Sequence, residues 1–368
     1  MENEKYLTEQ IITYLGNKRK LLTNIEDEIK KIQKALNKEK LTCVDLFSGS
    51  GIVARMLKQY SETLYVNDLE NYSRIINLCY LSNNDEIDWE LYDTLLNNLE
   101  KDLETNLISG IITENYAPKD DENIQEGERV FYTHNNAMLI DTIRDFIEKQ
   151  VPYDMQPLFL SPLLYEASVH ANTSGVFKGF YKSKTQNIGK FGGEGENALE
   201  RIKGKIIINK PPMSNFNVNC HVYQQNANEL VKVMPDVDVI YIDPPYNQHP
   251  YGSNYFMLNT IIDNQIGENI SEVAGIPSDW NKSEYNKKNE ALKALTDLIN
   301  NIRSKYVIIS YSSDGFISYD EMITMLSKRG EVSVKEIEYP TFRASRNLQN
   351  RDKHVNEYIF TLKIKNLA

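Results

Sequence analysis

The sequence predicts an α/β fold built on a doubly wound, mostly parallel sheet, and three observations carry this prediction. Short apolar runs that favour strands alternate with segments of helical periodicity along most of the chain. A glycine-rich turn at residues 48–51 joins the first of these runs to a helical segment, as in parallel strand–helix units. Residues 237–242 form an apolar, β-rich run, which indicates a strand buried on both faces.

The N-terminal part alternates between helix and strand. Apolar side chains at three- and four-residue spacing predict helix over residues 5–38, with a basic, turn-like segment at 14–20. Such alternation begins a parallel sheet, because each crossover needs a helix to return the chain to the same edge. The elements that follow are predicted as a strand at 41–47, a helix at 52–60, a strand at 63–66 and a helix to about residue 80.

The middle of the chain is less regular. Residues 82–129 hold 14 acidic and 3 basic residues, and we interpret their acidic side chains as a solvated face. Between residues 171 and 215 the periodicity fails, and glycines alternate with aromatic residues and lysines. A stretch of that length without a regular pattern is typical of a functional segment. The remaining predictions here are helices at 89–107, 136–149 and 155–170, a loop at 115–128 and a short strand-like run at 131–134.

The C-terminal part returns to alternating elements and completes the sheet. Its predicted strands are residues 217–224, 237–242, 306–310, 332–339 and 357–364, and its predicted helices are 228–233, 255–263, 286–304 and 319–328.

Composition limits the class of protein. The chain has 368 residues, 41% of them hydrophobic and 25% charged, which is ordinary for a globular protein. It contains no apolar run of about 18 residues and no apolar signal core at its N-terminus, so we expect no membrane span and a cytoplasmic location. The three cysteines Cys43, Cys79 and Cys220 lack metal-type spacing and fit a reducing compartment. The five histidines are scattered, so no metal site is expected.

The net charge of −11 at first disfavours a nucleic-acid partner, but its distribution does not. The acidic block at 82–129 carries all of the excess, since the rest of the chain is close to neutral. Residues 168–220 hold 8 basic and 3 acidic residues. The pattern therefore permits a nucleic-acid face without requiring one.

Two candidate binding features follow the first two predicted strands. Asp45-Leu46-Phe47-Ser48-Gly49-Ser50-Gly51 is a turn whose glycines let the backbone approach a ligand closely, at a helix N-terminus that favours a carboxylate. Its spacing differs from the GxGxxG of dinucleotide enzymes. Asp68 ends the second strand, where a carboxylate can accept both hydroxyls of a ribose or can cap the next helix. Together with the glycine turn, ribose binding is the favoured interpretation.

A third feature, Asp243-Pro244-Pro245-Tyr246, follows the buried strand 237–242. Two prolines stop the strand and hold a carboxylate, two carbonyls and a ring rigidly at its carboxyl end. An exocyclic amine of a nucleobase is a poor nucleophile, because its lone pair is delocalised into the ring. Hydrogen bonds from the amine to Asp243 and to the Pro244 carbonyl would draw it toward tetrahedral geometry, and Tyr246 would stack on the base at roughly 1–3 kcal/mol. The motif thus suits methyl transfer to such an amine.

At these residues the chain resembles the amino-methyltransferases that use S-adenosylmethionine, most closely the adenine-N6 DNA methyltransferases of the Dam-like D12 (alpha) group. The order matches: a glycine-and-lysine segment at 14–22, the glycine turn, the acidic strand end, a large insertion and then DPPY. The residues after DPPY, 247–260, resemble a restriction-modification subgroup. The resemblance implies a Rossmann-like methyltransferase sheet with an inserted target-recognition domain, and it is weakest at residues 82–130 and 265–285.

That resemblance also implies roles for individual residues. The cofactor S-adenosyl-L-methionine would be bound by Tyr14, Lys18, Asp45, Phe47, Ser48, Gly49, Gly51, Asp68 and Asn228, although the family often has Asp-Phe where this chain has Asn228-Glu229. Asp243, Pro244, Pro245 and Tyr246 would be catalytic. Residues 1–130 would be the cofactor-binding part, 131–215 the target-recognition insertion and 216–368 the catalytic part. The protein would be a monomer near the prokaryotic nucleoid, with double-stranded DNA as its partner and a cognate restriction endonuclease in the same system.

The basic stretch 168–220 is the expected DNA-contacting segment, because an enzyme of this type must flip the base out and grip the backbone. The candidates are Asn172, Thr173, Ser174, Lys178 and Lys182, with Arg343 and Arg346 in a second basic loop. A plain polar surface loop is the alternative for this stretch. Two alternatives for the whole chain also stand: a guanine-N2 RNA methyltransferase, which usually lacks so large an insertion, and an inactive DNA-binding protein on the same scaffold.

Overall fold

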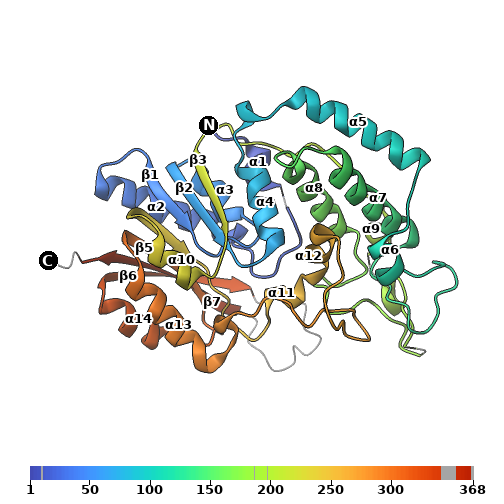
Figure 1. Ribbon diagram of the computed structural model, residues 1–368. Coiled ribbons are helices and arrows are strands. Elements are labelled where there is room, and N and C mark those ends of the chain that lie inside the picture. Colours follow the sequence, from blue (N-terminus) through green and yellow to red (C-terminus); the bar gives the residue numbers. More distant parts are fainter. Residues whose placement is uncertain (10, 186, 197, 341–353, 366–368) are drawn as a thin grey trace.

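A seven-stranded sheet forms the centre of the computed structural model, which describes residues 1–9, 11–185, 187–196, 198–340 and 354–365 (Figure 1). The strand order is β3-β2-β1-β4-β5-β7-β6. Strands β1 to β5 are parallel, β7 is antiparallel to β5, and β6 is antiparallel to β7. The strands are β1 Leu41–Asp45, β2 Ser61–Asp68, β3 Asn219–Gln224, β4 Val237–Ile242, β5 Ser304–Ser312, β6 Gly330–Pro340 and β7 His354–Ile364. The predicted fold class is confirmed.

The direction of winding reverses between β1 and β4, which lie side by side with Val44 opposite Ile240. From β1 the chain first builds outward through β2 and β3, and it then crosses back to β4 and continues to β5. In sheets of this kind the reversal leaves a crevice at the carboxyl ends of the strands. Those ends carry the three predicted motifs.

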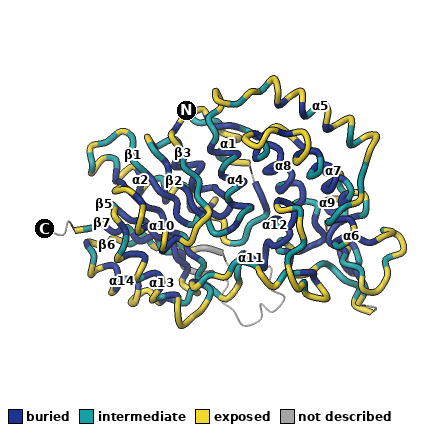
Figure 2. The backbone as a smooth tube through the Cα atoms, in the orientation of Figure 1, coloured by how far each residue is buried: buried dark blue, intermediate teal, exposed yellow. Residues whose placement is uncertain are grey.

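Helices cover both faces of the sheet, as the continuous burial of β4 requires. On one face, α2 (Leu22–Leu36) and α3 (Ile52–Lys58) enclose an apolar cluster with side chains of β1, β2 and β5. On the other face, α10 (Ala227–Val233), α13 (Lys288–Asn301) and α14 (Tyr319–Ser327) enclose a second cluster. Figure 2 shows the central strands buried beneath these helices.

A helical unit lies beside the sheet, on the right in Figure 1. It packs through α8 (Gln156–Val169) against α4 (Asn71–Leu81) and α12 (Phe256–Asp263). Arg144 joins α7 (His134–Gln150) to the end of α12 by donating to the carbonyls of Ile261 and Ile262. Helix α5 (Trp89–Thr105) packs on α7, so the acidic block 82–129 belongs to this unit. The other helices of the unit are α5 (Trp89–Thr105), α6 (Ile111–Tyr116), α7 (His134–Gln150) and α9 (Leu199–Lys203).

Two local predictions were wrong. Residues 5–38 do not form one helix: α1 (Glu4–Thr8) is followed by an irregular passage through Gly16, whose φ is +70°, before the 3-10 turn Arg19–Leu21 and α2. The run 131–134 forms no strand, because the Thr133 hydroxyl caps α7 by accepting from the Asn136 amide. The irregularity predicted for 171–215 is confirmed, since it holds only α9, the 3-10 turn Gly193–Gly195 and a bridge between Lys182 and Gly189 among its described residues.

The remaining short elements are the 3-10 turns Asn84–Glu86 and Glu284–Asn286 and helix α11 (Tyr251–Asn254). Among the described helices, none has the length and apolar character needed to cross a bilayer.

Candidate active site

A cavity opens to solvent at the carboxyl ends of β1, β2 and β4. All three predicted motifs contribute to its walls, together with the segment before α2. It is lined by residues from seven stretches of the chain: 14–18, 45–53, 67–70, 225–228, 241–245, 251–252 and 281–286. Of the residues predicted to bind a cofactor, all but Gly51 line it directly, and of the DPPY residues Asp243 and Pro245 do.

The glycine turn after β1 is shaped by its two left-handed glycines. Gly49 has φ +51°, and a Cβ there would lie 2.8 Å from Cε1 of Tyr14. Gly51 has φ +75° at the start of α3, and a Cβ there would lie 2.8 Å from Oδ1 of Asn77. Both positions therefore exclude a side chain, since real Cβ atoms do not approach so closely and L-residues rarely adopt this backbone. The turn brings its backbone directly beneath the Tyr14 ring.

Tyr14 is held over the turn by two further tyrosines. Its ring stacks with those of Tyr251 and Tyr255, each at 5.0 Å between centroids. The backbone of Leu15 is gripped at the same place, because its N–H donates to the Tyr255 hydroxyl at 2.8 Å and its carbonyl accepts from Tyr251 at 3.2 Å. The segment after DPPY thus fixes the N-terminal segment as one wall of the cavity.

Asp45 presents a buried carboxylate to the cavity. Only 1% of the residue is exposed, and neither carboxylate oxygen accepts a hydrogen bond of good geometry within the described part of the chain. Burial raises the pKa of this carboxyl, and the neighbouring acids Asp243 and Asp68 raise it further, against a partial lowering by the backbone amides of Ala54 and Phe47. An acid in this condition is stabilised by a cation bound next to it.

Asp68 joins the end of β2 to the glycine turn. Its Oδ2 accepts from the Gly49 amide at 2.8 Å, and its Oδ1 accepts from the Glu70 amide at 2.9 Å. Burial raises the pKa of the carboxyl, and these two amides offset part of the rise. Each carboxylate oxygen can accept a second hydrogen bond, so Asp68 can still bind a pair of ligand hydroxyls.

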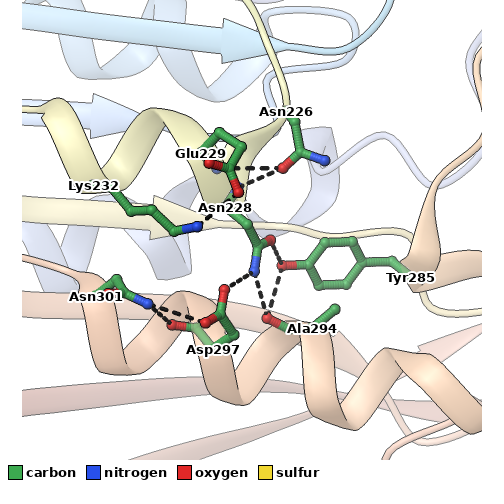
Figure 3. Close-up of polar contacts among 8 residues, drawn as sticks. All are labelled: Asn226, Asn228, Glu229, Lys232, Tyr285, Ala294, Asp297 and Asn301. Carbon is green, nitrogen blue, oxygen red and sulfur yellow. Dashed lines mark hydrogen bonds and ion pairs between the residues drawn. The ribbon is translucent and has the colours of Figure 1, made fainter.

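Asn228 lines the cavity, but its polar atoms are committed elsewhere (Figure 3). Its Nδ2 donates to Asp297 Oδ2 at 2.8 Å and to the Ala294 carbonyl at 2.9 Å, both on α13. Its Oδ1 accepts from the Tyr285 hydroxyl at 2.8 Å. The side chain therefore fastens α10 to α13 and to Tyr285, which is a different role from the direct cofactor contact that the sequence suggests.

Tyr285 and its neighbours were not singled out from the sequence, although residues 281–286 all line the cavity. The Tyr285 ring meets Phe47 edge to face at 5.2 Å between centroids. The segment is anchored by Asn281, which donates to the Leu69 carbonyl at 3.1 Å, and by Asn286, which donates to the Asn247 carbonyl at 2.7 Å. No periodicity or motif marks this segment, so only its long-range hydrogen bonds reveal its position.

Asp243 is the acid of the DPPY corner, and two partners hold one of its oxygens. Lys18 Nζ lies 3.1 Å from Oδ1, and Ser310 Oγ donates to the same atom at 3.1 Å. Within the described residues no side chain pairs with Oδ2. Burial raises the pKa of the carboxyl, while Lys18 and then Ser310 lower it. Lys18 thus pairs with the acid of the DPPY corner, and neither it nor Ser310 was predicted there.

The rest of the corner is fixed by packing. Pro244 is buried and Pro245 borders the cavity. The Tyr246 ring is half-buried and meets Tyr311 edge to face at 6.1 Å between centroids. Its carbonyl accepts from the Phe316 amide at 2.9 Å, which holds the corner against the loop after β5.

The residues predicted to contact DNA lie in different environments. Asn172 is fully buried, donates to the Val130 carbonyl at 2.9 Å and accepts from the Gly192 amide at 3.0 Å, so it supports the loop and has no surface for DNA. Thr173 is also buried, whereas Ser174 and Lys178 are exposed and Lys182 is half-exposed. Thr173 and Ser174 border a groove of about 780 Å³ next to Arg201. Arg343 and Arg346 lie outside the described residues.

Comparisons with known proteins agree with this site. The family model described as D12 class N6 adenine-specific DNA methyltransferase matches residues 14–325. Type II methyltransferase M.CviAII from Paramecium bursaria Chlorella virus 1 is 31% identical, with 96% of this chain and 99% of the relative covered. Type II methyltransferase M.NlaIII from Neisseria lactamica is 28% identical, with 95% and 99% covered. Modification methylase StsI from Streptococcus sanguinis is 30% identical, with 96% of this chain but 52% of the relative covered.

Proposed function

The chain belongs to the D12 class N6 adenine-specific DNA methyltransferase family, and from that premise we propose that it methylates the N6 amine of an adenine flipped out of duplex DNA, with S-adenosyl-L-methionine as donor. The single observation that carries the proposal is the shared cavity. The DPPY acid Asp243 and the glycine turn with Asp45 and Asp68 open into the same space, so a donor and an acceptor can meet there.

The donor fits the residues present. Asp45 is a buried acceptor without a partner in the described chain, and the ammonium group of the methionine end is the cation that suits it. Asp68 would accept the ribose hydroxyls, and the corner formed by Phe47 and Tyr285 offers aromatic surface to the purine. When bound, this cofactor supplies an electrophilic methyl group on a sulfonium.

The DPPY corner would orient the amine and the protein would supply no strong base. Lys18 and Ser310 occupy Oδ1 of Asp243, so we assign Oδ2 as the acceptor of one amine hydrogen, with the Pro244 carbonyl as the other. Tyr246 would stack on the base. The amine becomes acidic as its bond to the methyl group forms, so its proton can leave after transfer. Orientation and fixed charge then contribute most of the rate.

DNA would lie across the helical unit and residues 168–220, since the adenine must leave the duplex to reach Asp243. We propose residues 131–215 as the target-recognition part, and Ser174, Lys178 and Lys182 as surface contacts. The parts before and after it would serve cofactor binding and catalysis. The names of the Type II relatives favour a restriction-modification role. We further propose a cognate endonuclease as partner and a cytoplasmic, nucleoid-associated monomer as the working form.

Incubation with methyl-labelled S-adenosylmethionine tests the function directly. Duplex DNA, single-stranded DNA and RNA are offered in parallel, and the labelled product is identified after digestion. The proposal predicts label in N6-methyladenine of duplex DNA. Label in RNA guanine would support the alternative RNA methyltransferase, and DNA binding without transfer would support an inactive scaffold; either result would overturn the proposal.

A further inference from the structure

A buried ion cluster lies behind the catalytic acid. Lys18 has a side chain only 4% exposed, and its Nζ is 3.1 Å from Asp243 Oδ1 and 3.7 Å from Glu357 Oε2. Glu357 itself is 8% exposed. It lies on β7, beyond the residues 14–325 that the family model matches. One ammonium group is therefore shared by two carboxylates from distant parts of the chain.

The register of the sheet brings Glu357 to this place. It lies opposite Ser312 on β5, and Ile359 lies opposite Ser310, which donates to Asp243. Residues two apart on a strand face the same side, so Glu357 and Ser310 share one face of the sheet. Ile359 packs in the cluster beneath α2, and the Lys18 segment leads directly into that helix. Ser310 on β5 therefore contacts the DPPY acid directly, and Glu357 on β7 reaches it through Lys18.

The charges of the cluster depend on one another. Burial alone would lower the pKa of the Lys18 ammonium, but Asp243 and Glu357 outweigh it and hold it above its ordinary value. Burial raises the pKa of Glu357, Lys18 lowers it, and Asp243 and Asp314 raise it again. Glu357 Oε2 accepts no hydrogen bond within the described chain, so the positive charge of Lys18 is what offsets its burial. A buried ion pair is a poor source of stability because its desolvation cost offsets the attraction, so its presence here favours a functional role.

We propose that Glu357 is a positioning residue of the active site and acts on Asp243 through Lys18. The inference rests on the proposed function. Glu357 attracts the Lys18 ammonium as a second carboxylate beside Asp243. It thereby keeps Lys18 at Oδ1 of Asp243 and leaves Oδ2 to the amine. It also shares the positive charge, so Asp243 stays a strong hydrogen-bond acceptor. Without that second acid the full charge of Lys18 would fall on Asp243 and weaken its hold on the amine.

The sign of the pH effect follows from the surroundings. The titratable groups around the two acids are Lys18 before α2, Asp45 at the end of β1, Tyr241 on β4, Tyr246 in the corner, Tyr251 on α11 and Asp314 after β5. Glu357→Gln removes one negative charge from this set while Lys18 stays. The ionised form of Asp243 is then favoured, so its pKa falls and the acid limb of the pH–rate profile moves to lower pH.

The test compares Glu357→Gln with the parent and with Glu331→Gln, a control on the exposed part of the adjacent strand β6. Single-turnover methylation is measured against pH, and S-adenosylmethionine binding is measured by calorimetry. For Glu357→Gln we expect the plateau rate to fall about tenfold and the acid limb to move down by about one pH unit, with cofactor affinity nearly unchanged. Glu331→Gln should match the parent.

A second variant covers the case in which Glu357→Gln fails to fold. Glu357→Asp keeps the charge on a shorter side chain, and it should retain the acid limb of the parent. In a double-mutant cycle, Glu357→Gln and Lys18→Met should be clearly non-additive in unfolding free energy, because each change leaves the other group unpaired. An unmoved acid limb in Glu357→Gln, a moved limb in Glu357→Asp or additive unfolding energies would overturn the inference. An inactive parent protein would instead contradict the proposed function.

Discussion

Four of the acids that line the cavity have different partners, and these partners give them different tasks. The Asp45 carboxylate accepts no hydrogen bond of good geometry within the described chain and suits a cation. Asp68 is tied to two backbone amides, and Asp243 to Lys18 and Ser310. Glu70, two residues after Asp68, accepts from Asn259 at 2.8 Å and from Asn281 at 3.2 Å. Its role is to hold the wall that carries residues 281–286.

Glu70 should make stability depend on pH. Burial, and after it the charge of Asp68, raise the pKa of this carboxyl from an ordinary 4.5 to about 7. The folded state therefore binds more protons than the unfolded state between these values, so stability is lost as pH rises through 7. The loss is at most roughly 3 kcal/mol, the free-energy equivalent of the shift.

Urea unfolding of the parent and of Glu70→Gln at pH 5 and pH 7.5, without cofactor, measures this loss. Glutamine keeps an oxygen that Asn259 and Asn281 can donate to, and it cannot ionise. We expect the variant to gain stability relative to the parent as pH rises. A difference between the two proteins that stays constant with pH would show that Glu70 ionises normally in the fold.

At the scale of elements, the Asn228 network predicts a coupling between α10, α13 and the cavity wall. Asn228→Ala removes the 2.8 Å acceptor of the buried Tyr285 hydroxyl and one of the donors to Asp297. We expect a loss of about 1–3 kcal/mol in unfolding free energy, together with weaker binding of S-adenosylmethionine because Tyr285 is released.

Asn301→Ala is the matched control for that change, since Asn301 contacts the same Asp297 on the exposed side of α13 (Figure 3). Chemical unfolding and calorimetry of both variants provide the comparison. The control should change both quantities little. Equal effects of the two substitutions, or normal cofactor binding by Asn228→Ala, would contradict the role given to this network.

The strands and their motifs could be predicted from the sequence because their signals are local. The run that became β4 is buried along its whole length, and the residues that end β1, β2 and β4 reach the cavity because parallel strands end at one edge. The turn-like segment 14–20 could be recognised in the sequence, but the early end of α1 at Thr8 could not, since Tyr251 and Tyr255 hold Leu15 from a distant part of the chain. Residues 281–286 and Glu357 depend likewise on tertiary contacts.

One local signal for Glu357 was present in the sequence. It is an acid at the start of an otherwise apolar and aromatic run, in a strand that proves to be paired along both edges. Charged residues are rarely buried without a partner, so such a position marks a hidden ion pair. Its partner, Lys18, was assigned to cofactor binding, because the sequence does not show that β7 inserts between β5 and β6.

For the whole molecule, the uneven charge predicts where DNA lies. The acidic block sits on the helical unit around α5, while the basic stretch 168–220 provides Lys178 and Lys182 on the surface. Alanine at both lysines should weaken duplex binding and lower the slope of log K against log salt by roughly 1.8, because each phosphate that a lysine neutralises contributes about 0.9 to that slope.

Fluorescence anisotropy across a salt series measures this slope. The control is a double alanine variant at Lys288 and Lys293, two exposed lysines of α13 beside the sheet. It should keep the parent slope. An unchanged slope in the Lys178 and Lys182 variant would remove this loop from the DNA interface.

The central claim is that Asp243 holds the reacting amine next to a donor bound in the same cavity. The most direct measurement is single-turnover methylation of duplex DNA by Asp243→Ala, with cofactor and DNA binding measured on the same sample. The account predicts that transfer falls by a factor of at least about 1,000 while both ligands still bind. Methylation at the parent rate would contradict it.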